Sequence, residues 1–136
     1  MPEKVLVIDD DPNMTDLLSF LLIGRGYEVS LCNSGKDGIH KARNESPDVV
    51  ILDFMMEGMN GLQVCKQIRK FSSVPILILS ALDNPGTVVS ALDAGADDFL
   101  TKPVSSGLLI SRLNTLTRRG KTNDPSMSIP VYHASI

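Results

Sequence analysis

Short, fully hydrophobic segments alternate along this chain with longer stretches in which hydrophobic residues recur every three or four positions. The short segments are typical of strands buried on both faces, and the longer stretches are typical of helices with one buried face. The predicted strands cover residues 5–8, 27–32, 49–53, 75–79 and 98–101. The predicted helices run from Pro12 to Gly24 or Gly26, from Ser34 to before Pro47, from about Gly61 to Lys70, through 88–94 to Gly95, and from roughly Ser106 to Arg118.

Strict alternation of strands and helices predicts an α/β fold with a parallel sheet. Three strands (5–8, 49–52 and 75–79) are apolar throughout, so helices should cover both faces of this sheet. Crossovers between parallel strands are right-handed, which favours a doubly wound arrangement of five strands. The segment 27–32 alternates between polar and apolar residues and is expected nearer the sheet edge.

Residues 1–119 are predicted to form one domain, whereas the pattern changes from Gly120 onwards. Residues 120–128 lack periodicity and are typical of a linker or tail. The segment 129–136 is apolar again but too short for a domain. A frayed end, a docking peptide and the start of a removed or unseen second domain all fit this composition.

Composition narrows the function classes. A net charge of −3, four Phe, two Tyr and no Trp give no support to direct nucleic-acid binding. No apolar run approaches the roughly 18 residues that cross a bilayer, and the N-terminus lacks a signal peptide, so no membrane association and a cytoplasmic location are expected. Cys32 and Cys65 lie inside predicted elements and suit reduced thiols.

Polar residues follow the strands at the point where each one ends. Asp9 and Asp10 end the first strand, Asp53 the third, Ser80 the fourth and Lys102 the fifth. The carboxyl ends of parallel strands share one edge, with neighbouring strands about 4.8 Å apart. Carboxylates this close repel one another unless a cation lies among them, and oxygen ligands favour a hard divalent ion such as Mg²⁺. A hydroxyl and an ammonium group beside them complete a site for a phosphoryl group.

Each of these residues alone has a simpler interpretation as a turn former or a helix cap. Asp11, which precedes Pro12, is interpreted as a helix cap only. Because all the others fall at the same ends of alternating elements, a functional site is the preferred hypothesis.

The chain resembles the receiver domain of a two-component response regulator over about residues 4–119. The resemblance lies in V-L-V-I-D-D-D-P at the first strand, D-x-x-M-x-G-x-x-G from Asp53 to Gly61, S-A at 80–81, A-L-x-A-G-A-D-D-F, and T-K-P at 101–103. It implies a flavodoxin-like (βα)5 fold with strand order 2-1-3-4-5.

The resemblance also implies roles for the residues at the strand ends. Asp53 would accept a phosphoryl group from the phosphohistidine of a sensor histidine kinase or phosphotransfer protein. Asp9, Asp10, Asp53 and the backbone carbonyl of Met55 would hold Mg²⁺ or Mn²⁺. Such a domain catalyses its own phosphorylation and slow dephosphorylation and is not a turnover enzyme.

Ser80 and Lys102 would hold the phosphoryl oxygens, and Ser80 would move together with Phe99, at the family's aromatic switch position. The switching face implied is the fourth helix, fifth strand and fifth helix, about residues 85–118. This face would contact an output domain or target protein, and it leaves a homodimer open. The sequence names neither the kinase nor the output.

Two positions depart from the family pattern. Glu57 stands where receivers usually have proline, and Asn60 replaces a common Asp. These changes are expected to affect metal affinity and loop rigidity, because neither removes a reactive group. Met55 and Leu82, two residues beyond Asp53 and Ser80, are apolar, and we hypothesise that they slow self-dephosphorylation.

The pattern has two alternative functional interpretations. An Mg²⁺-dependent aspartyl-nucleophile phosphatase also uses Asp, Ser and Lys residues. Such enzymes, however, carry a D-x-D motif at the first strand and a cap domain for which this chain is too short. A nucleotide- or flavin-binding module is disfavoured because no glycine-rich phosphate loop follows any strand. Phosphorylation by acetyl phosphate separates a receiver from a phosphatase, which would release phosphate steadily.

Overall fold

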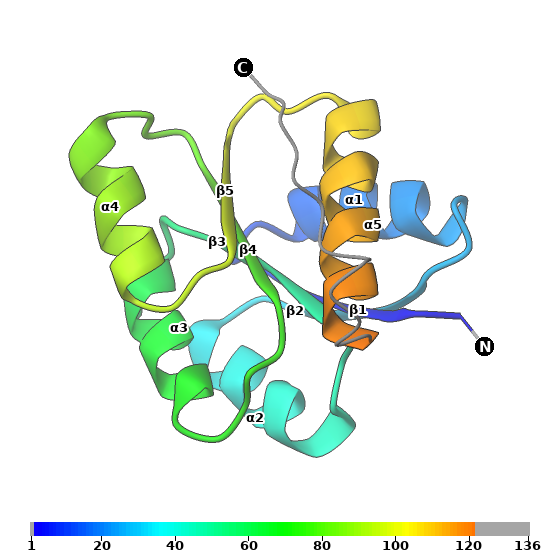
Figure 1. The fold of residues 1–136 in the computed structure, drawn as a ribbon, viewed down its shortest axis with the longest axis horizontal. Helices are drawn as coiled ribbons and strands as arrows, with labels where there is room; N and C mark the ends of the chain where they lie inside the picture. Colours follow the sequence, from blue (N-terminus) through cyan, green and yellow to red (C-terminus); the bar gives the residue numbers. More distant parts are fainter. Residues whose placement is uncertain (1, 122–136) are drawn as a thin grey trace.

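The computed structural model describes residues 2–121, in which strands and helices alternate along the chain (Figure 1). The strands are β1 (Lys4–Ile8), β2 (Glu28–Cys32), β3 (Val49–Asp53), β4 (Ile76–Ser80) and β5 (Asp98–Thr101). The helices are α1 (Pro12–Ile23), α2 (Gly35–Glu45), α3 (Gly61–Arg69), α4 (Pro85–Asp93) and α5 (Ser106–Lys121). All ten predicted elements are present. Helix α5 continues through Lys121, so the boundary expected at Gly120 falls in its last turn, and residues 122–136 of the predicted linker or tail lie outside the described residues.

Four of the helices begin at a polar N-cap side chain, which explains where each helix starts. The caps of α1, α2, α3 and α4 are Asp11, Ser34, Asn60 and Asn84, and each accepts a hydrogen bond from a main-chain N–H in the first turn. Such a bond satisfies a donor that the helix itself leaves free. The prediction that Asp11 and Ser34 are caps is therefore confirmed.

The sheet is parallel throughout, with strand order β2-β1-β3-β4-β5. This order confirms the predicted doubly wound, flavodoxin-like arrangement, with β2 at one edge. Strand β3 lies in the middle, between β1 and β4. Asp53, at its carboxyl end, pairs in register with Leu79 of β4, so Ser80 is one residue further along the neighbouring strand.

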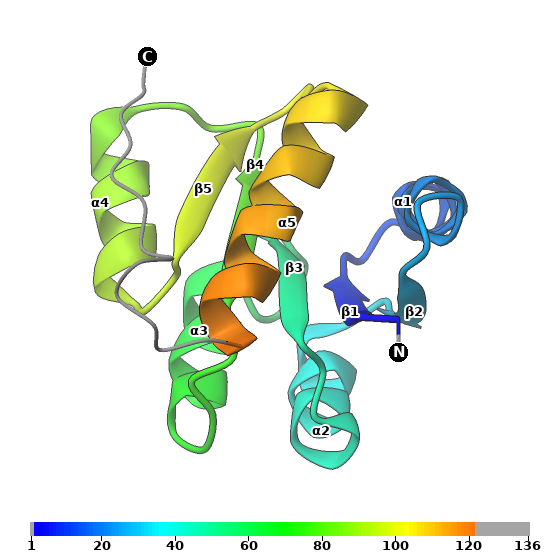
Figure 2. The ribbon, with the colours of Figure 1, turned by 45° about the vertical axis from the view of Figure 1, so that its right-hand side comes forward.

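Helices cover both faces of the sheet, as the apolar strands predict. Figures 1 and 2 show α1 and α5 on one face and α2, α3 and α4 on the other. Alternate strand residues point to the two faces: Val5, Val7 and Ile51 belong to the cluster with α1 and α5, whereas Leu6 and Ile8 belong to the cluster with the other helices. This alternation is the two-residue period of a strand with both faces buried.

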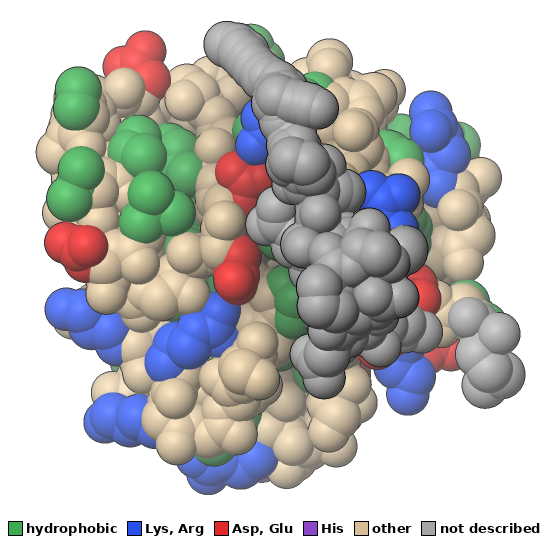
Figure 3. Space-filling model, viewed as in Figure 1, with side chains coloured by type: hydrophobic (Ala, Val, Ile, Leu, Met, Phe, Trp, Pro, Cys, Tyr) green, Lys and Arg blue, Asp and Glu red, His purple; other side chains and the backbone are tan. Residues whose placement is uncertain are grey.

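Some hydrophobic side chains remain on the surface. Figure 3 shows a group of them over α4, where Val89 is 55% and Leu92 is 47% exposed. On α1, Leu17 and Phe20 are also exposed. Leu18, the residue next to Leu17, is buried and faces the core.

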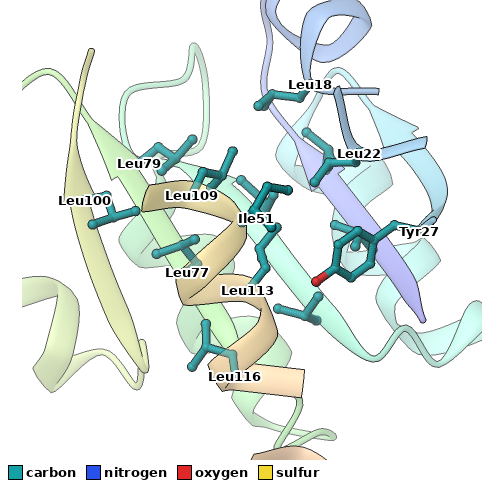
Figure 4. Packing of buried hydrophobic residues seen from close by; sticks show 14 residues of the cluster. Leu18, Leu22, Tyr27, Ile51, Leu77, Leu79, Leu100, Leu109, Leu113 and Leu116 are labelled. Atoms are coloured by element: carbon teal, nitrogen blue, oxygen red, sulfur yellow. The ribbon is translucent and has the colours of Figure 1, made fainter. Parts of the chain in front are cut away.

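The core beneath α1 and α5 fixes the position of the central strand. Figure 4 shows Leu18 and Leu22 of α1 and Leu113 of α5 packed around Ile51 of β3. Each fully buried aliphatic side chain of this kind contributes about 1.5–3 kcal/mol of burial free energy. Because the strands are anchored along their length, the residues at their carboxyl ends are held in fixed relative positions.

Among the helices of residues 2–121, none combines the length and the hydrophobicity needed to cross a membrane.

Candidate functional site

Two adjacent aspartates, which follow strand β1, have different surroundings. Asp9 is buried and Asp10 is exposed. The Asp9 carboxylate accepts a hydrogen bond from the main-chain N–H of Asp11 at 3.0 Å, while the Asp9 carbonyl accepts one from Asn33 Nδ2 at 2.8 Å. The loop that caps α1 therefore also fixes the Asp9 carboxylate at the edge of the sheet.

Asp53 is buried at the end of β3 and has a lysine as its direct partner. Lys102 Nζ lies 2.9 Å from Asp53 Oδ1 and 3.6 Å from Asp9 Oδ2. The main-chain N–H of Lys102 donates to the Ser80 carbonyl at 2.7 Å, which extends the β4–β5 pairing by one residue and aims the lysine at the two carboxylates. The structure thus brings Asp53, Asp9 and Lys102 together, as the sequence predicts.

The three aspartates at this edge form a compact cluster of carboxylates. One oxygen each from Asp9, Asp10 and Asp53 lies within 4.8 Å of the others. Octahedral Mg²⁺ has oxygen ligands at about 2.1 Å, which places neighbouring ligands about 3 Å apart and opposite ligands about 4 Å apart. Small adjustments would let these oxygens surround one ion. The all-oxygen donor set fits Mg²⁺ or Mn²⁺.

Burial and neighbouring charges shift the ionisation of this cluster. Burial raises the pKa of Asp53, the hydrogen bond from Lys102 opposes that rise, and the Asp9 carboxylate adds to it. Burial also raises the pKa of Asp9, against the hydrogen bond from Asp11 and the charge of Lys102. Burial alone would lower the pKa of Lys102, but its contacts with Asp53 and Asp9 leave that pKa raised. These contacts keep Lys102 positively charged. The three crowded carboxylates also favour binding of a second cation, such as a metal ion.

The remaining predicted site residues are Ser80, Phe99 and Met55. Ser80 is fully buried, and its Oγ accepts a hydrogen bond from the Leu82 N–H at 2.9 Å. Phe99 is half-buried and packs against the hydrophobic cluster under α3 and α4. Met55 lies two residues beyond Asp53 in the β3–α3 loop, with its side chain 56% exposed.

The β3–α3 loop makes a contact that the sequence interpretation missed. The main-chain N–H of Glu57 donates to Asp10 Oδ2 at 2.9 Å. The change from proline was expected to affect metal affinity and loop rigidity, and the amide that replaces it ties the loop to the segment between β1 and α1. The signal was present in the sequence, since a residue other than proline restores a main-chain donor.

Asn60, the second departure from the family pattern, begins α3. Its Oδ1 accepts from the Gln63 N–H at 3.0 Å, and Gln63 Oε1 accepts from the Asn60 N–H at 2.9 Å. This reciprocal pair is a capping box. Asn60 thus stabilises the helix start.

Residues 5–114 match the family model for the response regulator receiver domain. The chain is 40% identical over 121 residues to the sensory transduction protein RegX3 of Mycolicibacterium smegmatis, in an alignment covering 89% of this chain and 53% of that protein. It is 36% identical over 127 residues to the DNA-binding response regulator MtrA of the same organism, covering 93% of this chain and 56% of MtrA. The chain therefore spans about half the length of the curated relatives it matches.

Solved structures agree with this assignment. The receiver domain of the Francisella response regulator 1452 superposes with a TM-score of 0.83 at 35% identity, covering 88% of this chain and 99% of that one. The chemotaxis protein CheY4 of Vibrio cholerae gives a TM-score of 0.80 at 30% identity, covering 85% of this chain and 99% of that one. Fold, sequence and the order of the motifs thus agree, and the chain belongs to the response regulator receiver domain family of two-component signal transduction.

Proposed function

We propose that this chain is a phosphoacceptor switch in which Asp53 receives a phosphoryl group from the phosphohistidine of a sensor histidine kinase or phosphotransfer protein. The observation that carries the proposal is the surroundings of Asp53. Its buried carboxylate lies 2.9 Å from the Lys102 ammonium and beside the carboxylates of Asp9 and Asp10. A nucleophile, a fixed cation and a set of metal ligands meet at one edge of the sheet.

The chemistry follows from these groups. An oxygen of the ionised Asp53 carboxylate attacks phosphorus, the P–N bond to the donor imidazole breaks, and the imidazole leaves with the electron pair. Lys102, already beside Asp53, neutralises the oxygens of the transferred group. A divalent ion held by Asp9, Asp10, Asp53 and the Met55 carbonyl would supply further charge neutralisation there.

Ser80 and Phe99 are proposed to report the phosphorylated state. The fully buried Ser80 hydroxyl accepts from the Leu82 N–H and keeps its own hydrogen to donate to a phosphoryl oxygen. Phe99 lies on the neighbouring strand β5 and is half-buried, and it is proposed to move inward together with Ser80 upon phosphorylation.

The test is phosphorylation of the full chain by acetyl phosphate and Mg²⁺, followed by intact mass spectrometry. One added phosphoryl group is expected, and Asp53→Asn should abolish it. Asp16→Asn, which changes an exposed aspartate on α1, is the matched control and should be phosphorylated normally. Incorporation that persists in Asp53→Asn would place the acceptor elsewhere.

The alternative is an Mg²⁺-dependent aspartyl-nucleophile phosphatase, which the same Asp53 and Lys102 could serve. A switch retains the phosphoryl group and releases it slowly without turning over external substrates, whereas a phosphatase releases phosphate continuously. Phosphate release measured at many turnovers per protein chain would favour the phosphatase.

Two apolar surfaces support the proposed partners. A groove of about 630 Å³ lies between α1 and the β5–α5 loop. Lys102 lines part of it, and apolar side chains such as Leu17, Phe20 and Val104 line most of the rest. We assign it to a helix of the phosphoryl donor, because a helix there would lie beside the lysine that contacts Asp53.

The second surface comprises α4, β5 and α5, where Val89, Leu92 and Leu108 are exposed. We assign it to the output domain, a target protein or a second copy of this chain. Leu92→Ser should weaken phosphorylation-dependent association, measured by light scattering after size-exclusion chromatography, without altering phosphorylation of Asp53.

The length of the relatives supports a proposal on domain organisation. We propose that residues 1–119 form the receiver and that residues 120–136 connect it to an output domain, since this chain matches only 56% of MtrA, whose name describes a DNA-binding regulator. The sequence of the complete reading frame tests this directly.

A further inference from the structure

The loop after the proposed phosphorylation site is tied to the first strand by one hydrogen bond between residues far apart in the sequence. The main-chain N–H of Glu57 donates to Asp10 Oδ2 at 2.9 Å. Receivers usually carry proline at this position, and proline has no N–H to donate. We propose that the Glu57 amide is a positioning group that holds the Asp10 carboxylate in an orientation that strengthens binding of the divalent cation. This inference rests on the proposed metal site.

Asp10 needs such a partner more than the other two carboxylates do. Asp9 is buried and accepts from the Asp11 N–H, and Asp53 is buried and paired with Lys102. Asp10 is exposed, and its neighbours are two like charges. A main-chain donor counteracts the repulsion and hydration that favour turning the Asp10 side chain towards solvent. The Glu57 N–H supplies that donor.

The other end of this contact is itself fixed. The Glu57 carbonyl accepts from the Met59 N–H at 3.0 Å, which closes a three-residue turn around Gly58. The φ angle of +86° at Gly58 matches a γ-turn of positive φ, a conformation that favours glycine. Further along, the Gly61 N–H donates to the Phe54 carbonyl at 2.8 Å. The amide of Glu57 is therefore presented by a closed loop.

The same loop carries Met55, whose carbonyl is the fourth proposed ligand. Met55 lies between Asp53, at the end of β3, and Glu57, which is attached to Asp10. The hydrogen bond thus links the ligand from the first strand to the segment that supplies the carbonyl ligand. A partner that orients a metal ligand in this way typically changes metal affinity by 10–100-fold when it is removed.

The Glu57 side chain is not expected to carry this effect. It is exposed, and charges in solvent are screened by salt. The role belongs to the main chain, so the experiment must separate the amide from the charge. Glu57→Gln removes the charge and keeps the amide, whereas Glu57→Pro removes both. The loop is expected to accept proline, the usual residue of the family at this position.

The first measurement is Mg²⁺ affinity of the full chain by isothermal titration calorimetry. Glu57→Gln should bind within about threefold of the wild type, and Glu57→Pro about tenfold more weakly than Glu57→Gln. Thermal unfolding monitored by circular dichroism establishes that both variants fold. Equal or tighter binding by Glu57→Pro overturns the assignment, whereas a wild type that binds no Mg²⁺ overturns the proposed metal site instead.

The second measurement needs no metal. Amide hydrogen exchange in the metal-free protein should show the Glu57 N–H protected in the wild type, although the residue is exposed. Asp10→Ala should increase its exchange rate about tenfold or more. An exchange rate that is the same in both proteins would show that Asp10 does not hold this amide, and the inference would be wrong whatever the metal affinity.

Discussion

Replacing Lys102 with methionine tests the electrostatics of the site most directly. The lysine is the only cation paired with the two buried carboxylates among residues 2–121, at 2.9 Å from Asp53 and 3.6 Å from Asp9. Methionine keeps much of the side-chain length and its packing but removes the charge. The variant leaves two adjacent, buried, negatively charged groups without a counter-ion.

The magnitude follows from burial. The side chains of Asp9 and Asp53 are only 4% and 8% exposed, whereas that of Lys102 is 24% exposed. Removing one partner of a buried ion pair costs about 3–5 kcal/mol, and the partial exposure of the lysine places this case near the lower end. We therefore expect Lys102→Met to lower the free energy of unfolding by about 3 kcal/mol at neutral pH, measured by urea denaturation without metal.

The loss should depend on pH with a defined sign. Burial already raises the pKa values of Asp53 and Asp9, and Lys102 opposes that rise, so its removal raises both further. Carboxyl groups with a raised folded-state pKa favour folding below their ordinary value of 3.8, and this contribution is lost as pH rises through the folded-state values. The deficit of Lys102→Met should therefore shrink in mildly acidic solution and reach its full size above those values. Saturating Mg²⁺ at neutral pH should also restore part of the stability.

A double-mutant cycle provides the critical control. In an Asp53→Asn background the main partner of Lys102 is already neutral, so Lys102→Met should cost less there by about 1–3 kcal/mol. If Lys102→Met costs the same in both backgrounds, or if its deficit grows as pH falls, the ion pair does not stabilise this site in the way described here.

Three further predictions concern the loops around Asp53. Gly61→Ala should destabilise the fold by about 1–3 kcal/mol in urea unfolding, because a Cβ there lies 2.8 Å from the Asp53 carbonyl oxygen; unchanged stability would contradict this close approach. Asn60→Ala should lower stability by about 1 kcal/mol through loss of the α3 cap, and Asn60→Asp, which keeps a capping oxygen, should not. Met55→Asn and Leu82→Asn should each shorten the lifetime of phospho-Asp53, measured by mass spectrometry after removal of acetyl phosphate; a wild-type half-life of seconds would count against a protective role for these two apolar side chains.

The sequence by itself determined the alternation of strands and helices and indicated the residues of the candidate site. Fully apolar segments such as 49–52, bounded by turn residues, favour strands covered on both faces, because a partly exposed strand of this composition would leave hydrophobic surface in water. Once the strands are parallel, their carboxyl ends meet at one edge. The side chains that follow them, Asp9, Asp53 and Lys102, must then lie close together. The alternation of elements follows from periodicity, whereas the strand order that makes β1 and β3 neighbours came from the resemblance to receiver domains.

Only the tertiary structure decided which atoms pair at that edge. The hydrophobic pattern of the sequence does not predict that Lys102 lies closer to Asp53 than to Asp9. The distances from the lysine to the two carboxylates depend on strand register and on how the loops pack against each other. Leu17 and Leu18 are both apolar, and only the packing of α1 decides that Leu18 reaches the core while Leu17 stays exposed. The contact between Glu57 and Asp10 spans two loops and uses a main-chain amide, a donor that every residue except proline carries. Side-chain chemistry read along the chain identifies the groups of a site, whereas the hydrogen bonds of the backbone that orient them appear only when the loops are folded together.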